Sequence, residues 1–290
     1  MATKIERDEV SGVDTTGHVW DGIKELNTPL PRWWVWIFYA TIIWSVGYWI
    51  AYPAWPTLTG YTKGLLGYSS RAELETNMTA ARAAQAANLD KIEAMSLVEI
   101  KADANLLQFA VAGGKSAFAV NCSQCHGSGA SGAVAYPNLN DDDWLWGGTL
   151  DALQTSISHG IRDMRDDDTR ISDMPAFLSD ELLDKTQVAQ VAEFVLSLSG
   201  SEHDAAAAKE GAMLFEENCA ACHGETGQGD QEQGAPKLSN QIWLYGGDRA
   251  TIVETISYSR KGMMPAWNGI LDEATIKQLT LYVHSLGGGE

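Results

Sequence analysis

Two short motifs of cysteine and histidine carry the clearest chemical signal in this chain. They hold all four of its cysteines and read Cys122-Ser-Gln-Cys125-His126 and Cys219-Ala-Ala-Cys222-His223. Residues three apart lie on one face of a helical turn, so the two thiols of a motif can both form thioether bonds to one haem. The adjacent histidine then presents its imidazole to the iron. The pattern predicts two covalently bound haem c groups, with His126 and His223 as axial ligands.

The second axial ligand of each iron should lie downstream, on a loop over the opposite face of the haem. Met174 follows His126 by 48 residues and Met264 follows His223 by 41, and each precedes Pro-Ala and an aromatic residue. The proline stiffens the loop, and a thioether ligand raises the reduction potential relative to a second histidine. We expect Met174 at the first haem and Met264 at the second. Because both axial positions would be filled, electron transfer is expected rather than oxygen chemistry.

Other ligands and other kinds of site also fit parts of this pattern. His159 and Met164 are alternative ligands for the first iron, and Met263 is an alternative for the second. We interpret His159 as a polar residue near the haem that has its own hydrogen-bond partner. Paired cysteines could also form a four-thiolate zinc site or two redox-active disulfides. Neither of these needs the adjacent histidine or the downstream methionine.

The chain repeats itself from about residue 111. The matched segments are 121–127 with 218–224, 137–148 with 236–247, and 174–177 with 264–267. Their offsets are 97, 99 and 90 residues, so the first copy carries an insertion before its methionine, within 162–173. Each copy closes with apolar residues at helical spacing. We therefore expect a mainly α protein with two tandem cytochrome c domains, 111–200 and 201–290.

Several residues of the repeat should support these sites without binding iron. Trp144 and Trp243 occupy the repeated Trp-Leu-x-Gly-Gly element, and we expect both to pack in the core. Tyr136, Pro137 and Pro236 are expected to line the loop on the histidine side of each haem.

An uncharged run of 24 residues, 33–56, precedes the repeats. About 20 residues span a bilayer core, and tryptophan and tyrosine crowd both ends of the run as they do at membrane interfaces. About 30 polar residues precede the run, and no small-x-small cleavage site follows it. The run is therefore predicted to be an uncleaved transmembrane anchor. A buried core helix is the alternative. The remaining segments are 1–32, before the anchor, and 57–110, a connector whose expected role is spacing.

The orientation follows from the cofactor, since lysines and arginines are balanced at the two ends of the run. Haem is attached by thioethers on the outer side of energy-transducing membranes. We therefore expect residues 1–32 in the cytoplasm and the two repeats in the periplasm of a single-pass inner-membrane protein.

The net charge of −18 is concentrated in the repeats. Residues 1–110 hold 9 Lys/Arg against 12 Asp/Glu, a net of −3; residues 111–200 hold 5 against 13, a net of −8; and residues 201–290 hold 6 against 13, a net of −7. This balance argues against nucleic acid and anionic lipid as partners of the repeats. It suits a basic protein partner, or simple solubility.

The chain resembles the diheme subunit, CcoP or FixP, of cbb3-type cytochrome c oxidases. The resemblance covers nearly the whole chain. It is carried by the leader GHVWDGIKELNTPLPRWWVWIFYATIIW at 17–44, YPAWP at 52–56, the two CxxCH motifs, WLWGG and WLYGG, MPAF and MMPAW, and the ending YVHSLGGGE. The CxxCH motif alone is common to many cytochromes, whereas its pairing with this leader is far more specific.

The resemblance implies an electron-transfer subunit of a proton-pumping haem–copper oxidase. The implied partners are a haem–copper catalytic subunit, where oxygen is reduced, and a monoheme cytochrome c subunit. The implied donors are a soluble or membrane-anchored cytochrome c and the quinol–cytochrome c reductase. Some relatives have a second membrane helix, for which this chain offers no candidate. No catalytic residue is expected in this chain.

The resemblance also implies a ligand set for each haem. Cys122, Cys125, His126 and Met174 would serve the first, and Cys219, Cys222, His223 and Met264 the second. A free-standing, membrane-anchored diheme electron shuttle is the alternative function. A diheme peroxidase is disfavoured, because both repeats offer a methionine that would fill the position where peroxide must bind.

Overall fold

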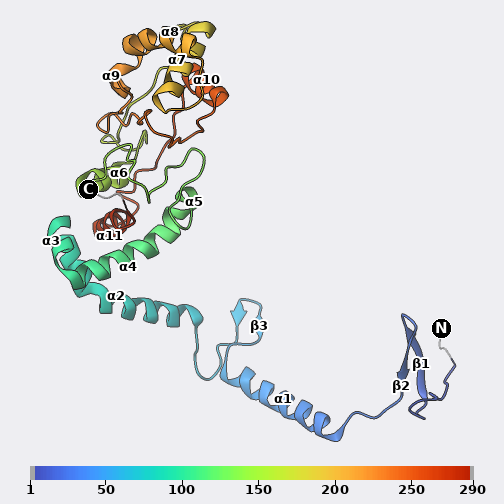
Figure 1. Cartoon of the computed structure of the whole chain (residues 1–290). Helices are drawn as coiled ribbons and strands as arrows, with labels where there is room; N and C mark the ends of the chain where they lie inside the picture. Colours follow the sequence, from blue (N-terminus) through green and yellow to red (C-terminus); the bar gives the residue numbers. More distant parts are fainter. Residues whose placement is uncertain (1–3, 288–290) are drawn as a thin grey trace. The chain divides into compact units, whose positions relative to one another are not determined.

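The computed structural model describes residues 4–287 of a mainly helical chain (Figure 1). Three residues at each end, which belong to the expected N-terminal segment and to the second repeat, lie outside the described part. The chain forms two compact units, Met1–Ala84 and Gln85–Glu290. The second unit contains both CxxCH motifs, so it is the one that positions the candidate sites.

The first unit contains a β-hairpin that the sequence analysis did not anticipate. Strands β1 (Thr15–Trp20) and β2 (Ile23–Leu26) pair antiparallel. The turn between them is formed by Asp21 and Gly22, which both have positive φ angles, of 48° and 86°. Asp-Gly is a favoured sequence for a two-residue hairpin turn, because both positions need a left-handed backbone. The signal was therefore present in the sequence.

Helix α1 (Arg32–Ala51) is the one helix among the described residues that is long and apolar enough to cross a membrane. Its 20 residues span about 30 Å, and none of them is buried, which argues against a buried core helix. The helix ends before the expected limit of residue 56, because Pro53 cannot continue the hydrogen-bonding pattern of a helix. A short pair of strands follows, β3 (Pro56–Thr57) and β4 (Gly60–Tyr61).

Short helices joined by long loops build the second unit. The C-terminal end of α2 (Ser70–Ala94) belongs to this unit. The other helices are α3 (Leu97–Ala102), α4 (Ala104–Asn121), α5 (Ser123–His126), α6 (Leu150–His159), α7 (Lys185–Leu198), α8 (Ala205–Asn218), α9 (Ala220–His223), α10 (Arg249–Tyr258) and α11 (Glu273–His284). Most begin at a side chain that accepts hydrogen bonds from the first turn. These capping residues are Ser96, Asp103, Thr149, Asp184, Asp204, Asp248 and Asp272. Part of the acidity of the repeats thus serves to start helices.

Helix α4, the first of the first repeat, packs against α11, the last of the second repeat (Figure 1). Their backbones meet closely, since a Cβ atom on Gly114 would lie 2.0 Å from the carbonyl oxygen of Gln278. One turn further along, the rings of Phe118 and Tyr282 are 5.4 Å apart. Helix α6 completes this core, which contains Leu153 and Ile157.

The reciprocal pair is α8, the first helix of the second repeat, and α7, the last helix of the first repeat (Figure 1). A Cβ atom on Gly211 would lie 2.0 Å from the carbonyl oxygen of Gln190, and the rings of Phe194 and Phe215 are 5.1 Å apart. Each repeat therefore contributes its last helix to the core of the other repeat. The expected boundary near residue 200 separates the repeats in sequence, but it does not separate two packed units.

The second half of the connector also does more than provide spacing. Ile92, at the end of α2, and Ile100, in α3, are fully buried in a cluster that includes Leu281 of α11. The Lys277 side chain on α11 donates hydrogen bonds to three carbonyl oxygens at the C-terminal end of α2, with Nζ–O distances of 2.7 to 3.2 Å. This positive charge satisfies carbonyl groups that a helix end leaves free. The spacing role expected for 57–110 is thus wrong for its C-terminal half.

Candidate haem-binding sites

Each CxxCH motif forms one helical turn that continues the long helix before it. In the first motif (122–126), the backbone amides of Cys125 and His126 both donate to the carbonyl of Cys122, at 3.1 and 2.9 Å. The second motif (219–223) repeats these bonds at the same distances, with Cys219 as acceptor. Both turns end at a glycine with positive φ. The local backbone is thus the one expected for two thiols on one face of a turn.

The histidines of the two motifs have matching hydrogen-bond partners. The Nδ1 atom of His126 lies 3.1 Å from the carbonyl oxygen of Pro137, and that of His223 lies 3.0 Å from that of Pro236. Since a carbonyl can only accept, Nδ1 must carry the hydrogen, and Nε2 is left as the electron-pair donor for a metal. Burial lowers the pKa of both histidines, which favours the neutral, ligating form. The expected place of the two prolines beside the histidines is confirmed.

All four cysteines are free thiols. Burial raises the pKa of Cys122 and of Cys219 to about 11. Burial of these two thiols therefore disfavours the thiolate form. Cys122 and Cys219 also lie in different clusters, so the two motifs do not meet in a four-thiolate site.

The two Met-Pro methionines lie in different cores, but not in the ones that the sequence suggests. Met264 packs against the cluster that contains Phe118 and Cys122. Met174 packs against the cluster that contains Phe215 and Cys219. The structure thus packs each methionine against the cluster of the other repeat's motif, because the loop that carries it crosses to that repeat.

The competing methionines are poorly placed to bind iron. The exposed fraction of Met164 is 83%, and that of Met263 is 60%. Neither residue packs against a core cluster among the described residues. Met174 and Met264 are half-buried against such clusters. Burial and position in the repeat therefore both favour these two methionines over Met164 and Met263 as candidate ligands.

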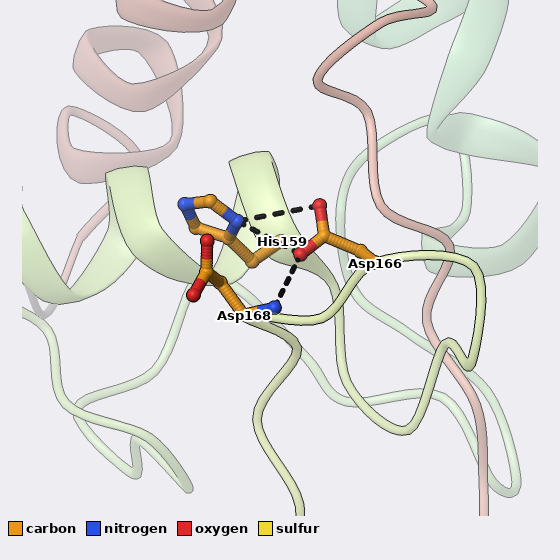
Figure 2. Close-up of side chains that lie close together, drawn as sticks. All are labelled: His159, Asp166 and Asp168. Atoms are coloured by element: carbon orange, nitrogen blue, oxygen red, sulfur yellow. Dashed lines mark hydrogen bonds and ion pairs between the residues drawn. The ribbon is translucent and has the colours of Figure 1, made fainter.

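His159 lies at the end of α6 and is bound by the carboxylate of Asp166 (Figure 2). Its Nδ1 atom is 3.1 Å from the nearer carboxylate oxygen of Asp166, which also accepts from the backbone amide of Asp168 at 2.8 Å. Ligand atoms of these three residues lie within 4.8 Å of one another, and they form the one such group found between residues 4 and 287. Asn268 also donates to Asp166. Hydrogen bonds within the group account for its geometry, which agrees with the interpretation of His159 as a partnered polar residue.

The two tryptophans of the repeated element pack in the cores, as expected. Trp144 borders the cluster around Phe118, and Trp243 borders the cluster around Phe215. They therefore help to shape the apolar surroundings of the motifs.

Asp163 is a supporting residue that the sequence analysis missed. It is buried, with an exposed fraction of 2%, and its Oδ2 atom accepts from the backbone amide of Ala266 at 2.9 Å. Hydrogen bonds from the Arg165 guanidinium hold the pKa of this carboxyl well below its usual range. Asp163 thus anchors the loop of Met264. Its one signal in the sequence was its position in the insertion of the first repeat.

The donor atoms that gather in each core fit a covalently attached haem. Each motif offers two thiols on one turn, one packed in the core and one exposed, and an imidazole whose Nδ1 faces a carbonyl, while a half-buried thioether packs against the same core. Tetrahedral zinc sites in proteins use sulfur, nitrogen and carboxylate ligands rather than a thioether. One histidine and one methionine are a known axial pair of c-type cytochromes.

Three family models match separate parts of the chain. Residues 12–59 match the N-terminal domain of cytochrome oxidase-cbb3, FixP. Residues 111–199 match cytochrome c, and residues 206–283 match cytochrome c oxidase, cbb3-type, subunit III. The three matches follow the order of anchor, first repeat and second repeat.

Characterised relatives are similar over nearly the whole length. The cbb3-type cytochrome c oxidase subunit CcoP of Cereibacter sphaeroides is 53% identical over 290 residues, which is 100% of both chains. Subunit FixPc of Rhizobium leguminosarum bv. viciae is 55% identical, and the match covers 97% of this chain and 98% of that subunit. Subunit FixP of Rhizobium meliloti is 53% identical, with full coverage of both.

Proposed function

Since the chain belongs to the CcoP and FixP family of cbb3-type cytochrome c oxidase subunits, we propose that it receives electrons through two covalent haem c groups and relays them to the oxidase. As a member of this family, the chain is a cytochrome c subunit of a membrane oxidase, and its cofactor is haem c. The number of haems, the ligands, the orientation and the individual partners belong to the proposal.

The ligands are proposed from the duplicated geometry. Cys122 and Cys125 attach one haem, and Cys219 and Cys222 attach the other. His126 and His223 are axial ligands, and Met174 and Met264 fill the opposite positions. The observation that carries this proposal is the repeated bond between a histidine Nδ1 and a proline carbonyl, because it leaves Nε2 of each histidine free for iron.

The residues of this chain set the properties of the cofactor. A haem c supplies a one-electron couple when it is bound. The partly buried, neutral histidine and the uncharged thioether would favour ferrous iron. A histidine and a methionine that both held the iron would leave no coordination position for oxygen, so oxygen reduction would belong to a haem–copper partner subunit.

The membrane topology follows from the anchor and from the site of haem attachment. Helix α1 crosses the inner membrane once. Thioether attachment on the outer side of the membrane places the repeats in the periplasm and residues 4–31 in the cytoplasm. The haem–copper subunit and the monoheme cytochrome c subunit are the partners in the complex.

The acidity of the repeats suits a basic cytochrome c as electron donor. The net charges of −8 and −7 on residues 111–200 and 201–290 would attract a cationic partner over about a Debye length, roughly 10 Å at 0.1 M salt. Stopped-flow reduction by a basic cytochrome c should therefore slow by about tenfold or more from low to physiological ionic strength. A reduction rate that does not depend on salt would contradict electrostatic binding of the donor.

A haem-stained denaturing gel and a pyridine haemochrome assay on membranes test the cofactor. Two covalent haems per chain are expected, one haem in the double variant Cys122→Ser/Cys125→Ser, and one in Cys219→Ser/Cys222→Ser. Absence of covalent haem from the native chain would refute the proposal. Copurification with a haem–copper subunit is expected as well, whereas a chain isolated alone with both haems would support the free-standing shuttle.

A further inference from the structure

We propose that the β-hairpin before the membrane helix docks onto a basic cytoplasmic loop of a membrane-spanning subunit of the oxidase (Figure 1). This docking rests on the proposed function, which places residues 4–31 in the cytoplasm. It goes beyond that function, because electron transfer through the two repeats does not require the hairpin.

The hairpin has almost no core of its own. Between residues 4 and 31 the buried residues are Thr15 and Gly17, and no apolar side chain of this segment is buried. Strands β1 and β2 form a sheet of two strands only. A two-stranded hairpin is marginally stable in water unless a further strand or a helix covers it. A stable hairpin at this position therefore needs cover from another molecule.

One face of the hairpin already has a partner in the segment before it. Lys24, which lies opposite Val19, forms an ion pair with Glu6. Glu6 is joined to β1 by two further bonds. Its carbonyl accepts from the backbone amide of Thr15 at 2.7 Å, and its own amide donates to the Thr15 hydroxyl at 3.0 Å. The charge of Lys24 is thus satisfied within the chain.

The other face, called the open face below, exposes large apolar side chains. Trp20 and Ile23 lie opposite each other in the register, so they share this face. Their exposed fractions are 64% and 73%. The carboxylate of Glu25 belongs to the same face, because it accepts from the Trp20 indole and from the Thr16 hydroxyl, each at 2.9 Å. The members of the open face are Thr16, His18, Trp20, Ile23 and Glu25.

The chemistry of the open face suits a cationic side chain of a partner. Two neutral donors orient the carboxylate of Glu25, and no ion pair with it is found between residues 4 and 287. The indole of Trp20 beside it can stack on a guanidinium group. An arginine of the partner could contact both groups at once, and Ile23 could pack on the apolar stem of such a side chain.

The chain holds the hairpin close to the membrane. Five residues, 27–31, join the end of β2 to the start of α1, and two of them are prolines. Five residues reach at most about 18 Å even when they are fully extended. The hairpin must therefore lie at the membrane surface, beside the subunits that share the membrane with α1.

The charge of this region favours a protein over lipid as the partner. Residues 4–26 hold 3 Lys/Arg against 6 Asp/Glu, a net of −3. The cytoplasmic leaflet is anionic and would repel this segment. The cytoplasmic loops of membrane-spanning proteins carry an excess of lysine and arginine. Such a loop would complement both the net charge of the segment and the carboxylate on the open face.

Photo-crosslinking in the assembled oxidase tests the contact. A benzophenone amino acid is placed at Ile23 of the full-length chain, and the products of illuminated membranes are mapped by mass spectrometry. We expect an adduct with a Lys/Arg-rich cytoplasmic loop of a membrane-spanning oxidase subunit. The same amino acid at Val10, which is exposed but outside the open face, should give little of this adduct. Absence of the adduct, or adducts with lipid or a soluble protein alone, would overturn the docking.

Hydrogen exchange provides a test with the unmodified chain. The amides of residues 19–24 should exchange at least about tenfold more slowly in the whole oxidase than in the same chain purified alone, because docking covers the hairpin. Equal exchange rates in the two states would overturn the docking.

The charge of the partner is tested by Glu25→Gln, which keeps an acceptor oxygen but removes the negative charge. The ratio of exchange rates between the two states corrects for any change in the hairpin itself. This substitution should reduce the ratio by about threefold, as expected for an exposed ion pair. Glu9→Gln, the same change at an exposed position outside the open face, should leave the ratio unchanged. Equal ratios for the two variants would overturn a basic loop as the partner.

Failure of the docking differs from failure of the proposed function. An oxidase that contains this chain with both haems, but with an unprotected hairpin, would overturn the docking alone. A native chain without covalent haem would instead overturn the proposed function.

Discussion

At the scale of single residues, hydrogen bonding and burial give the histidine of each motif a defined, neutral imidazole. A proline carbonyl fixes the tautomer of each histidine, and burial keeps the imidazole neutral. On the opposite side, a buried carboxylate holds the loop of Met264 through a backbone amide. The supporting residues are thus as specific as the ligands, although only the ligands belong to a recognisable motif.

The substitution Asp163→Asn tests the anchor of the Met264 loop. The amide keeps the shape of the side chain but loses the charge that accepts from Ala266 and Arg165. We expect the far-red methionine band of one haem to disappear at a lower denaturant concentration than in the native chain. Asp167→Asn, at an exposed position in the same segment, is the control. If the band disappeared at the same denaturant concentration in both variants, Asp163 would not be the anchor of the Met264 loop.

At the scale of elements, close helix crossings hold the repeats together. Glycine allows the backbones of α4 and α11, and those of α8 and α7, to touch. Aromatic rings fill the space one turn away in both pairs. The helices that begin each repeat therefore have their main partners in the other repeat.

The substitution Gly114→Ala tests the crossing of α4 and α11. An added Cβ would lie 2.0 Å from a backbone carbonyl, which cannot rotate away as a side chain could. We expect the free energy of unfolding to fall by about 1–3 kcal/mol, as for other overpacked cores. Ser116→Ala, on the exposed face of the same helix, should change it by less than about 0.5 kcal/mol. Similar denaturation midpoints for both variants would contradict the close crossing.

The ion pair between Glu193 and Arg249 gives the attachment of α7 to α10 a pH dependence. The Arg249 guanidinium lowers the pKa of Glu193 below its usual value of 4.5. The stabilisation is therefore fully present above that value and is lost as the pH falls through the lower pKa of the folded state. Glu193→Gln should cost about 1–2 kcal/mol at pH 7, with a difference that shrinks in acid. Denaturation from pH 7 to 3 measures it, and a difference independent of pH would contradict this assignment.

At the scale of the whole molecule, the second unit is an intertwined pair of repeats. Each repeat packs its core around a helix that the other repeat supplies. This arrangement resembles domain swapping, but within one chain, where an identical surface accepts an equivalent element. The two candidate haem sites are consequently held in one structure and should not form independently.

Truncation after residue 200 tests this interdependence. The remaining chain keeps the first motif but loses α11 and Met264. We expect any haem attached to it to lack the far-red methionine band, and the band to return when residues 201–290 are co-expressed as a separate chain. A truncated chain with a normal band and potential would show that the first repeat completes its own site.

The sequence by itself determined the family of this protein and its candidate haem motifs. The CxxCH motifs, the Met-Pro pairs, the repeat and the uncharged run of 33–56 are local patterns whose meaning follows from bonding geometry and bilayer thickness. The helices that they implied were found, with α1 shortened by Pro53. Residue types at fixed spacing were sufficient, because these properties depend on neighbours along the chain.

Only the tertiary structure decided which partner each element has. Met174 and Met264 are interchangeable in the sequence, since each follows a motif at a similar spacing and belongs to the same repeated pattern. The two repeats are similar, so α7 and α11 carry similar apolar patterns. These patterns alone do not show against which core each helix packs. The choice depends on bonds between distant residues, such as Asp163 with Ala266 and Asp173 with Lys261. Such bonds leave no periodic trace in a single sequence, and they hold the loops of one repeat against the other.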